Sequence, residues 1–297
     1  MIRMTGMDRL SILISSYNRG DIIGRSIDSI LSSNLPDGLE LEIVIVDDRS
    51  DEETWRIIES YREDPRFIIH RNDQRIGMGG PNWNKAFELS TGNIVTNNED
   101  DMIWHRDYIG ILYRELKKYD PYTCVVGMYI QSPDPDDLKP PKTRPRDPYP
   151  DFGIFTGIPK KKSMIPTEHV CHNQFFCRRE FFDGLKELWP TLVKGSGLRE
   201  EDDLFLRTLK LVPQRKYVAV PSAYLWHVYL SDGGYHREKL IRSKRAKESH
   251  EMFLKRNFGK RALPMILCFR IYMVQRRFRD LVGTRVLDRF FRKGKKV

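Results

Sequence analysis

Short apolar runs recur along the first hundred residues, separated by segments with apolar side chains at helical spacing. Four of the runs have the length and apolar character of buried strands: 10–15, 41–46, 67–70 and 93–96. Three amphipathic segments lie between them: 22–32, 52–62 and 82–89. Asp21 directly precedes the first of these helices and is expected to cap it. Strands and helices that alternate at this spacing predict a parallel sheet with right-handed crossovers.

The second half of the chain has a less regular pattern. Helices are predicted over 104–118, 178–189 and 200–211, and strands over 123–130, 170–176 and 217–220, the last followed by the stretch 224–227. The proline-rich stretch 131–166 is expected to be a functional or mobile loop, because connections of this length are uncommon inside a compact domain. The last 60 residues place apolar side chains at helical spacing among arginines, which predicts two helices separated at Pro264.

Polar side chains gather directly after each of the first four predicted strands. The clusters are 17–19, 47–48, 72–73 and 99–101. Because the carboxyl ends of parallel strands meet at one edge of a sheet, we expect these clusters to lie together where open α/β sheets bind ligands. Four clusters on one edge indicate a binding site.

The most concentrated of these clusters is the acidic run Glu99-Asp100-Asp101. Carboxylates this close repel one another, so a bound divalent cation is a natural partner. The alternative is that the run forms the acidic first turn of the helix predicted from residue 104, stabilised by the helix dipole. The residues of this cluster alone leave both interpretations open.

Charge is distributed unevenly along the 297 residues. The net charge is +10, but residues 236–297 hold 20 Lys and Arg against 5 Asp and Glu, a net of +15, which leaves −5 for the rest. A basic helical extension can contact an anionic membrane surface or nucleic acid, or it can be a solvated helical face. The nucleic-acid interpretation is disfavoured, since the expected pocket is acidic and no nucleic-acid-binding motif accompanies the basic residues.

Composition and cysteine usage bear on localisation. The chain is 40% hydrophobic and 31% charged, as expected of a globular protein. No apolar run has the length of a membrane-spanning helix, and residues 1–9 lack the apolar core of a signal peptide. Four cysteines without a small-domain framework favour reduced thiols. We therefore expect a cytoplasmic protein, or one that is peripheral at the inner face of the membrane.

The order of these motifs resembles glycosyltransferase family 2, the inverting nucleotide-sugar enzymes, over about residues 11–227. Four stretches carry the resemblance: the opening strand and turn 14–19, the second-strand aspartates 43–50, the turn and helix 77–92, and the Asp-x-Asp-like 99–101. The chain departs from the family pattern at Glu99, where aspartate is more usual, at Arg49 in place of glycine, and at Gly79-Gly80-Pro81.

The resemblance implies a GT-A fold, which is an α/β fold with a mostly parallel, Rossmann-like sheet flanked by helices. It implies a catalytic domain over 1–235, with a nucleotide-sugar-binding half (1–119) and an acceptor half (120–235). Residues 236–297 would then form the basic amphipathic helical extension.

The resemblance also implies roles for individual residues. Tyr17 would lie against the nucleobase, and Asp47 or Asp48 would accept a hydrogen bond from it. Asp101 would bind the metal, with His227 as a second ligand and Glu99 assisting. The remaining residues implied in nucleotide-sugar binding are Ser16, Arg19, Asn82, Lys85 and Asp100. Asp100 alternatively only shapes the turn.

The acidic run 200–203 resembles the start of the helix that carries the family's catalytic base. The register read from Asp203-Leu204 to Arg207 assigns the base to Glu201, whereas the register read from the Glu-Asp dipeptide assigns it to Asp202. We favour Asp202 because the family's base is usually aspartate. An acidic first helical turn is the structural alternative.

The implied reaction moves a sugar from a nucleotide diphosphate sugar to a hydroxyl of a glycan, lipid-linked or other acceptor. UDP-sugars are the favoured donors, then GDP-sugars, and Mn²⁺ or Mg²⁺ is the expected cofactor. The loops 131–166 and 231–237 are expected to order over the bound donor. The alternatives are a non-catalytic nucleotide-binding relative and a nucleotidyltransferase. The sequence leaves the oligomeric state open.

Overall fold

The computed structural model describes residues 6–77, 80–132, 134–140, 175–186, 188–189, 203–204, 207, 215–228 and 244–263. The strands are β1 (Asp8–Ser16), β2 (Leu39–Asp47), β3 (Phe67–Arg71), β4 (Ile94–Glu99), β5 (Met102–Trp104), β6 (Thr123–Ser132), β7 (Phe176–Arg178) and β8 (Lys216–Val228). The helices are α1 (Ile23–Leu31), α2 (Glu52–Glu59), α3 (Gly80–Leu89), α4 (Tyr108–Leu116) and α7 (Lys244–Phe258), with 3₁₀ turns η1 (Arg179–Phe182) and η2 (Gly259–Arg261).

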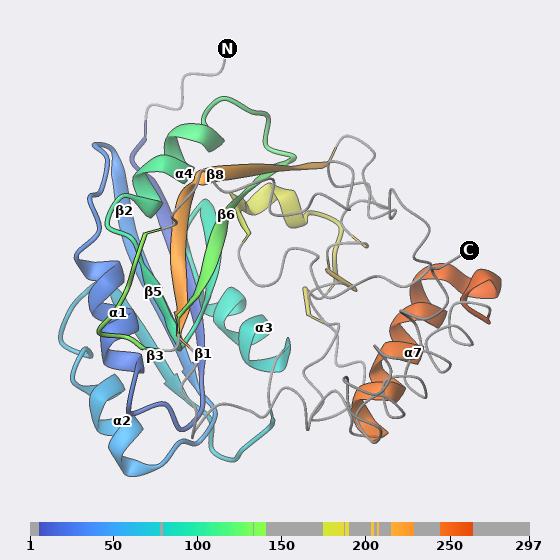
Figure 1. Cartoon of the computed structure of the whole chain (residues 1–297), viewed down its shortest axis with the longest axis horizontal. Coiled ribbons are helices and arrows are strands. Elements are labelled where there is room, and N and C mark those ends of the chain that lie inside the picture. The colour runs from blue at the N-terminus through green and yellow to red at the C-terminus, as the bar shows by residue number, and fades with distance from the viewer. Residues whose placement is uncertain are drawn as a thin grey trace, which may run out of the picture.

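The described strands form one sheet in the order β3-β2-β1-β4-β7-β6-β8-β5. The first four strands of the chain run parallel to one another, as predicted. The other half is mixed, since β7 runs antiparallel to β4 and β6, β8 runs parallel to β6, and β5 runs antiparallel to β8. In Figure 1, α1 and α2 lie on one side of the sheet and α3 on the other.

Side chains of the central strands alternate between two hydrophobic clusters, as the two-residue period of a strand requires. In β1, Ile12 and Ile14 pack in the cluster that includes α1 and α4, whereas Leu13 packs in the cluster that includes Trp83 of α3. All three side chains are fully buried. This two-sided burial explains why the run 10–15 is mostly apolar.

The segment after the acidic run differs from the prediction. Residues 102–104 form the short strand β5, and the following helix α4 begins only at Tyr108. Trp104 is paired in register with Leu225 of β8, and its indole Nε1 donates to Asn98 at 2.6 Å. The acidic run is therefore a turn between two strands, and its interpretation as the first turn of a helix was wrong.

Two further local predictions were wrong. Asp21 does not cap α1, because the helix begins at Ile23 and the N–H groups of Ile22 and Ile23 donate to the Arg19 carbonyl. Of the helix expected over 178–189, the described residues form only the 3₁₀ turn η1, followed by Gly184 at a φ of +84°. Arg179 N donates to the carbonyl of Asn93, and this contact fixes the chain at that point.

Elements predicted in the second half differ in extent from those of the structure or are described only in part. The strand expected over 217–220 is part of the longer strand β8, which has an irregularity where it pairs with β6. Of the helix predicted over 200–211, the structure describes residues 203, 204 and 207, all helical. Most of the loops 131–166 and 231–237, and Pro264 with the residues after it, lie outside the described residues.

The first helix of the basic extension buries apolar side chains. Phe253 and Leu254 of α7 pack with Ala262, and all three are buried. Part of the apolar stripe thus packs within the extension itself. Among the described residues, no helix has both the length and the apolar character required to cross a membrane. Cys124 and Cys177 are free, buried thiols on paired strands.

Candidate metal and nucleotide site

The predicted polar clusters lie at the carboxyl ends of three neighbouring parallel strands. Ser16 at the end of β1 is in register with Asp47 at the end of β2, and Ser15 is in register with Glu99 at the end of β4. The chain therefore leaves these strands at one level of the sheet. The prediction that the clusters meet at one edge is confirmed for these strands.

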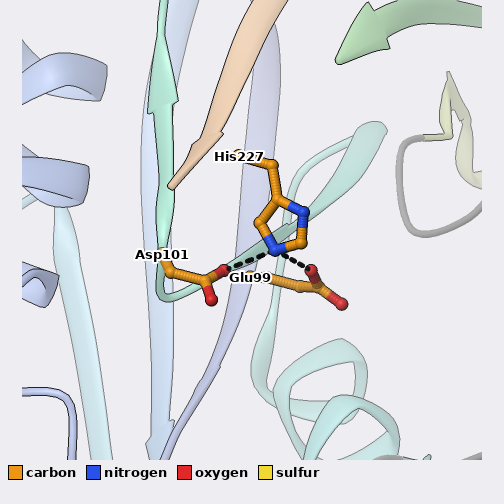
Figure 2. A group of neighbouring side chains, drawn as sticks. All are labelled: Glu99, Asp101 and His227. Atoms are coloured by element: carbon orange, nitrogen blue, oxygen red, sulfur yellow. Dashed lines mark ion pairs between the residues drawn. The ribbon is translucent and has the colours of Figure 1, made fainter. Parts of the chain in front are cut away.

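Glu99, Asp101 and His227 converge at this edge (Figure 2). His227 Nε2 lies 3.3 Å from Asp101 Oδ1 and 3.6 Å from Glu99 Oε2. One potential ligand atom from each residue lies within 4.8 Å of the others. Two carboxylate oxygens and an imidazole nitrogen at this spacing can bind a divalent cation such as Mn²⁺.

Pairing between β5 and β8 brings His227 to the carboxylates. Met102 is in register with His227, so the histidine stands opposite the residue after Asp101. Val228 N donates to the Asp101 carbonyl at 2.9 Å. Backbone hydrogen bonds between β5 and β8 thus join segments that are far apart in sequence. These bonds hold His227 close to Asp101.

Arg19 lies on the other side of the acidic run. Its Nη2 donates to Asp101 Oδ2 at 3.0 Å, and its Nε lies 3.4 Å from Asp100 Oδ1. Burial lowers the pKa of Arg19, but the carboxylates of Asp100 and Asp101 outweigh burial and hold its pKa above the ordinary value. Arg19 therefore orients Asp101, because one carboxylate oxygen faces Arg19 and the other faces His227.

Asp100 shapes the turn, as one of the two sequence interpretations expected. Its Oδ2 accepts a hydrogen bond from Tyr17 N at 3.3 Å. Burial raises the pKa of Asp100 to about 7, although Arg19 acts in the opposite direction. Asp100 ties the turn after β4 to the turn after β1.

The two aspartates after β2 have different surroundings. Asp48 accepts hydrogen bonds from Asn72 Nδ2 at 3.0 Å, from Ile76 N at 2.9 Å and from Gly77 N at 3.0 Å. Asp47 Oδ2 accepts from Ser50 N at 3.2 Å and lies 3.3 Å from Arg71 Nε. Asp48 holds the turn 72–77 in place.

The second oxygen of Asp47, Oδ1, lacks a hydrogen-bond donor among the described residues. Asp47 is fully buried, and its Oδ1 has no hydrogen-bond partner there. Burial raises the pKa of Asp47. A buried acceptor without a donor is costly unless a ligand or water supplies one.

Arg75 was missed in the sequence. Its guanidinium Cζ lies 3.9 Å from the centroid of the Tyr17 ring, the ring expected against the nucleobase. The stacking is a cation–π contact. Arg75 follows β3 in the same polar stretch as Asn72, so the strand-end rule would have found it if that cluster had been extended by two residues.

Asn82 and Lys85 of α3 are placed differently from one another. Asn82 is buried, accepts from Asn72 Nδ2 at 2.9 Å and donates to the Gly77 carbonyl at 3.2 Å. Lys85 instead pairs with Glu88 on the surface of α3, at 3.3 Å. Asn82 therefore belongs to the network around Asp48, whereas Lys85 contacts its own helix.

The candidate bases Asp202 and Glu201 lie outside the described residues. Their neighbour Asp203 is fully buried, with Oδ2 2.5 Å from Arg207 Nε and Oδ1 3.4 Å from Arg256 Nε. The Asp203 carboxylate thus contacts two guanidinium groups, those of Arg207 and Arg256.

Comparison with known protein families tests the resemblance to glycosyltransferase family 2. The family model for "Glycosyl transferase family 2" matches residues 11–185, more than half of the chain. The chain belongs to glycosyl transferase family 2. The match includes Glu99 and Asp101 and ends before Asp203 and His227.

Two curated relatives have named acceptors. A UDP-Glc:α-D-GlcNAc-diphosphoundecaprenol β-1,3-glucosyltransferase of Escherichia coli is 33% identical over 33% of this chain and 37% of its own length. A GalNAc(5)-diNAcBac-PP-undecaprenol β-1,3-glucosyltransferase of Campylobacter jejuni is 28% identical over 32% and 30%. The chain thus aligns with about a third of each of these family 2 relatives.

Solved structures share the fold over most of the chain. Staphylococcus aureus TarS 1–349 in complex with UDP-GlcNAc has a TM-score of 0.60 at 13% identity, over 83% of this chain and 64% of that one. The mannosyltransferase PcManGT from Pyrobaculum calidifontis, in complex with GDP-Man and Mn²⁺, has a TM-score of 0.60 at 19% identity, over 91% and 70%. The family 2 chain therefore has the predicted GT-A fold.

Proposed function

We propose that this chain is a metal-dependent, inverting glycosyltransferase that uses a nucleotide diphosphate sugar, with UDP-sugars favoured and GDP-sugars next. The observation that carries the proposal is the convergence of Glu99, Asp101 and His227 at the carboxyl end of β4. Family 2 membership supports the reaction class.

The residues at this edge fit a divalent cation. Asp101 Oδ1 is buried and makes no hydrogen bond within the described residues, and it faces His227 Nε2. Asp101 and His227 would hold the ion, with Glu99 assisting directly or through water. Mn²⁺ suits the mixed oxygen and nitrogen ligands better than Mg²⁺, which prefers oxygen. When bound, the cation would neutralise the charge of the departing diphosphate.

Asp47 supports a uracil-containing donor. Its unpartnered Oδ1 can accept a hydrogen bond from the imide N–H of uracil, and the N1–H of guanine offers the same donor. Tyr17, stacked on Arg75, supplies an aromatic face beside it. Asp48, Asn72 and Asn82 hold the turn that borders this position. Ser16 and Arg19 complete the turn after β1.

The proposed base is Asp202, with Glu201 as the alternative. Asp203 is a poor candidate, since its carboxylate is fully buried between Arg207 and Arg256. The base would take the proton from an acceptor hydroxyl while the oxygen attacks C1 from the face opposite the diphosphate. The C1–oxygen bond forms as the C1–phosphate oxygen bond breaks, and the anomeric configuration inverts.

The proposed acceptor is a lipid-linked glycan. Two curated relatives have undecaprenol-diphosphate acceptors in their names. The basic residues of 236–297 would then hold the enzyme near an anionic bilayer, where each Lys or Arg contributes about 1 kcal/mol. Salt-sensitive co-sedimentation with phosphatidylglycerol vesicles, lost when residues 264–297 are removed, would agree with this; equal binding to neutral vesicles would contradict it.

Thermal unfolding with a panel of nucleotides tests the donor class. We expect UDP with Mn²⁺ to raise the Tm more than GDP, dTDP or CMP with Mn²⁺, and more than UDP alone. A ligand at a hundred times its Kd stabilises a protein by about 2.7 kcal/mol, which such a scan resolves. A panel without any metal-dependent shift would contradict the proposed function.

A further inference from the structure

Arg256 of α7 contacts Asp203, which directly follows the proposed base Asp202 in the chain. Its Nε lies 3.4 Å from Asp203 Oδ1, whereas Arg207 Nε lies 2.5 Å from Asp203 Oδ2. Each arginine thus faces one oxygen of a carboxylate that is fully buried. A buried carboxylate requires such partners, because an uncompensated buried charge is strongly destabilising.

The two arginines differ in what they connect. Arg207 is four residues from Asp203 in the same helical segment, so this pair stabilises the segment locally. Arg256 comes from the basic extension, on a helix whose Phe253 and Leu254 are buried. The contact with Arg256 therefore links Asp203 to α7, whereas the contact with Arg207 stays within one stretch of chain.

A second set of contacts attaches the same segment to the nucleotide side. Arg207 Nη2 donates to the Leu188 carbonyl at 2.5 Å. Asn84 of α3 accepts from Leu188 N at 3.1 Å and from Trp189 N at 3.0 Å, and donates to the Trp189 carbonyl at 2.6 Å. Asn84 lies two residues after Asn82, which joins the network around Asp48. Asp203 and Arg207 are thus linked to both α7 and, through Leu188 and Asn84, α3.

We infer that Arg256 is a positioning residue for the catalytic base: it holds Asp203, the residue next in the chain to the proposed base Asp202. The inference rests on the proposed function. It also gives the basic extension a role within the catalytic domain. A misplacement of about 1 Å at a reacting group can cost a hundredfold in rate. Loss of the Arg256 contact is therefore expected to lower kcat.

Steady-state kinetics with UDP-glucose, Mn²⁺ and GlcNAc-diphosphoundecaprenol test this inference. We expect Arg256→Ala to lower kcat by about a hundredfold, with the donor KM and the Kd for UDP within about twofold of wild type. Arg256→Lys should restore part of kcat, since it keeps the charge. Lys255→Ala, an exposed neighbour on α7, should behave as wild type. Wild-type kcat in Arg256→Ala, or a parallel loss of UDP binding, would overturn the inference.

Hydrogen exchange keeps the inference testable if the donor or acceptor differs from these probes. We expect amides of residues 203–207 to exchange at least about tenfold faster in Arg256→Ala than in wild type or Lys255→Ala, because local opening sets these rates. Unchanged exchange would overturn the inference whatever the kinetics show. A wild-type chain that lacks both turnover and UDP binding, but shows the exchange effect, would contradict the proposed function and leave the role of the Arg256 contact supported.

Discussion

Residues 6–119 and the described residues of 120–263 build the same sheet in different ways. In the first half, β1, β2, β3 and β4 are parallel, and helices connect them in sequence order. In the second half, β7 joins β4 to β6, and β8 pairs with both β6 and β5. The first half supplies Glu99 and Asp101, whereas the second supplies His227. The site is complete only where the two halves meet, at the pairing of Met102 with His227.

The largest effect is expected from the first-half carboxylate. Asp101→Asn keeps the size of the side chain and the backbone contact to Val228, but removes the charge that would bind the cation. Transfer from a UDP-sugar donor should fall by about a thousandfold, since a catalytic metal contributes several kcal/mol to the transition state. Circular dichroism should stay unchanged. Asp107→Asn, at a half-exposed carboxylate outside the cluster, is the control. Transfer within tenfold of wild type would remove Asp101 from the metal site.

The second-half ligand should have a smaller effect. We expect His227→Asn to weaken Mn²⁺ binding about tenfold or more, because two carboxylates remain. Calorimetric titration of Mn²⁺ in the presence of UDP measures this. His105→Asn is a matched control, since His105 stacks on Tyr224 outside the cluster. Equal Mn²⁺ affinity in His227→Asn and wild type would mean that the first half holds the ion without the second.

Substitutions at two glycines, one in each half, compare how tightly the two halves are packed. A Cβ at Gly92 would lie 2.5 Å from the Arg9 carbonyl oxygen and 2.9 Å from Ser11 N, which are backbone atoms of β1. A Cβ at Gly127 would meet the ring of Tyr108 on α4. Since a backbone yields less than a side chain, Gly92→Ala should lower the free energy of unfolding by about 3 kcal/mol and Gly127→Ala by about 1–2 kcal/mol. Urea unfolding measures both; the reverse order would show that the second half is the more rigid.

The smallest effect is expected from Glu42, which supports the first half away from the site. Burial alone would raise the pKa of Glu42, but hydrogen bonds from Ser11 and Thr91 outweigh burial and lower its pKa. Glu42→Gln should therefore cost about 1 kcal/mol of unfolding free energy at pH 7. This contribution is present above the ordinary carboxyl pKa and is lost as the pH falls through the lower folded value.

Urea unfolding of wild type and Glu42→Gln between pH 7 and pH 3 measures this dependence. The difference between the two proteins should shrink below about pH 4, where the carboxylate of the unfolded chain takes up a proton before that of the folded protein does. A difference that stays constant over this range would show that the hydrogen bonds do not favour the charged form. UDP binding should be equal in the two proteins at pH 7.

Sequence alone predicted much of the first half, because its contacts are local. The strand-end rule located Glu99, Asp101 and Asp47 correctly at one edge of the sheet. It could not predict β5, because three residues have no period of their own and pair only with the distant β8. It also placed Arg19 at this edge, where its guanidinium contacts Asp100 and Asp101.

The second half was predicted less well for the same physical reason. The resemblance drew attention to His227, but only long-range pairing brings it to Asp101. Helical periodicity predicted α7 without indicating what it packs against. The contact between Arg256 and Asp203 depends on tertiary placement, which the spacing of apolar residues does not encode.

Coupled binding of Mn²⁺ and UDP tests the central claim most directly. Calorimetry should show that UDP binds wild type at least about tenfold more tightly with Mn²⁺ than without it, and that Asp101→Asn loses this coupling but keeps the metal-free affinity. The residues around Asp47 and Tyr17 are intact in that variant. UDP affinity that is the same with and without Mn²⁺ in wild type would contradict a metal site formed by Glu99, Asp101 and His227.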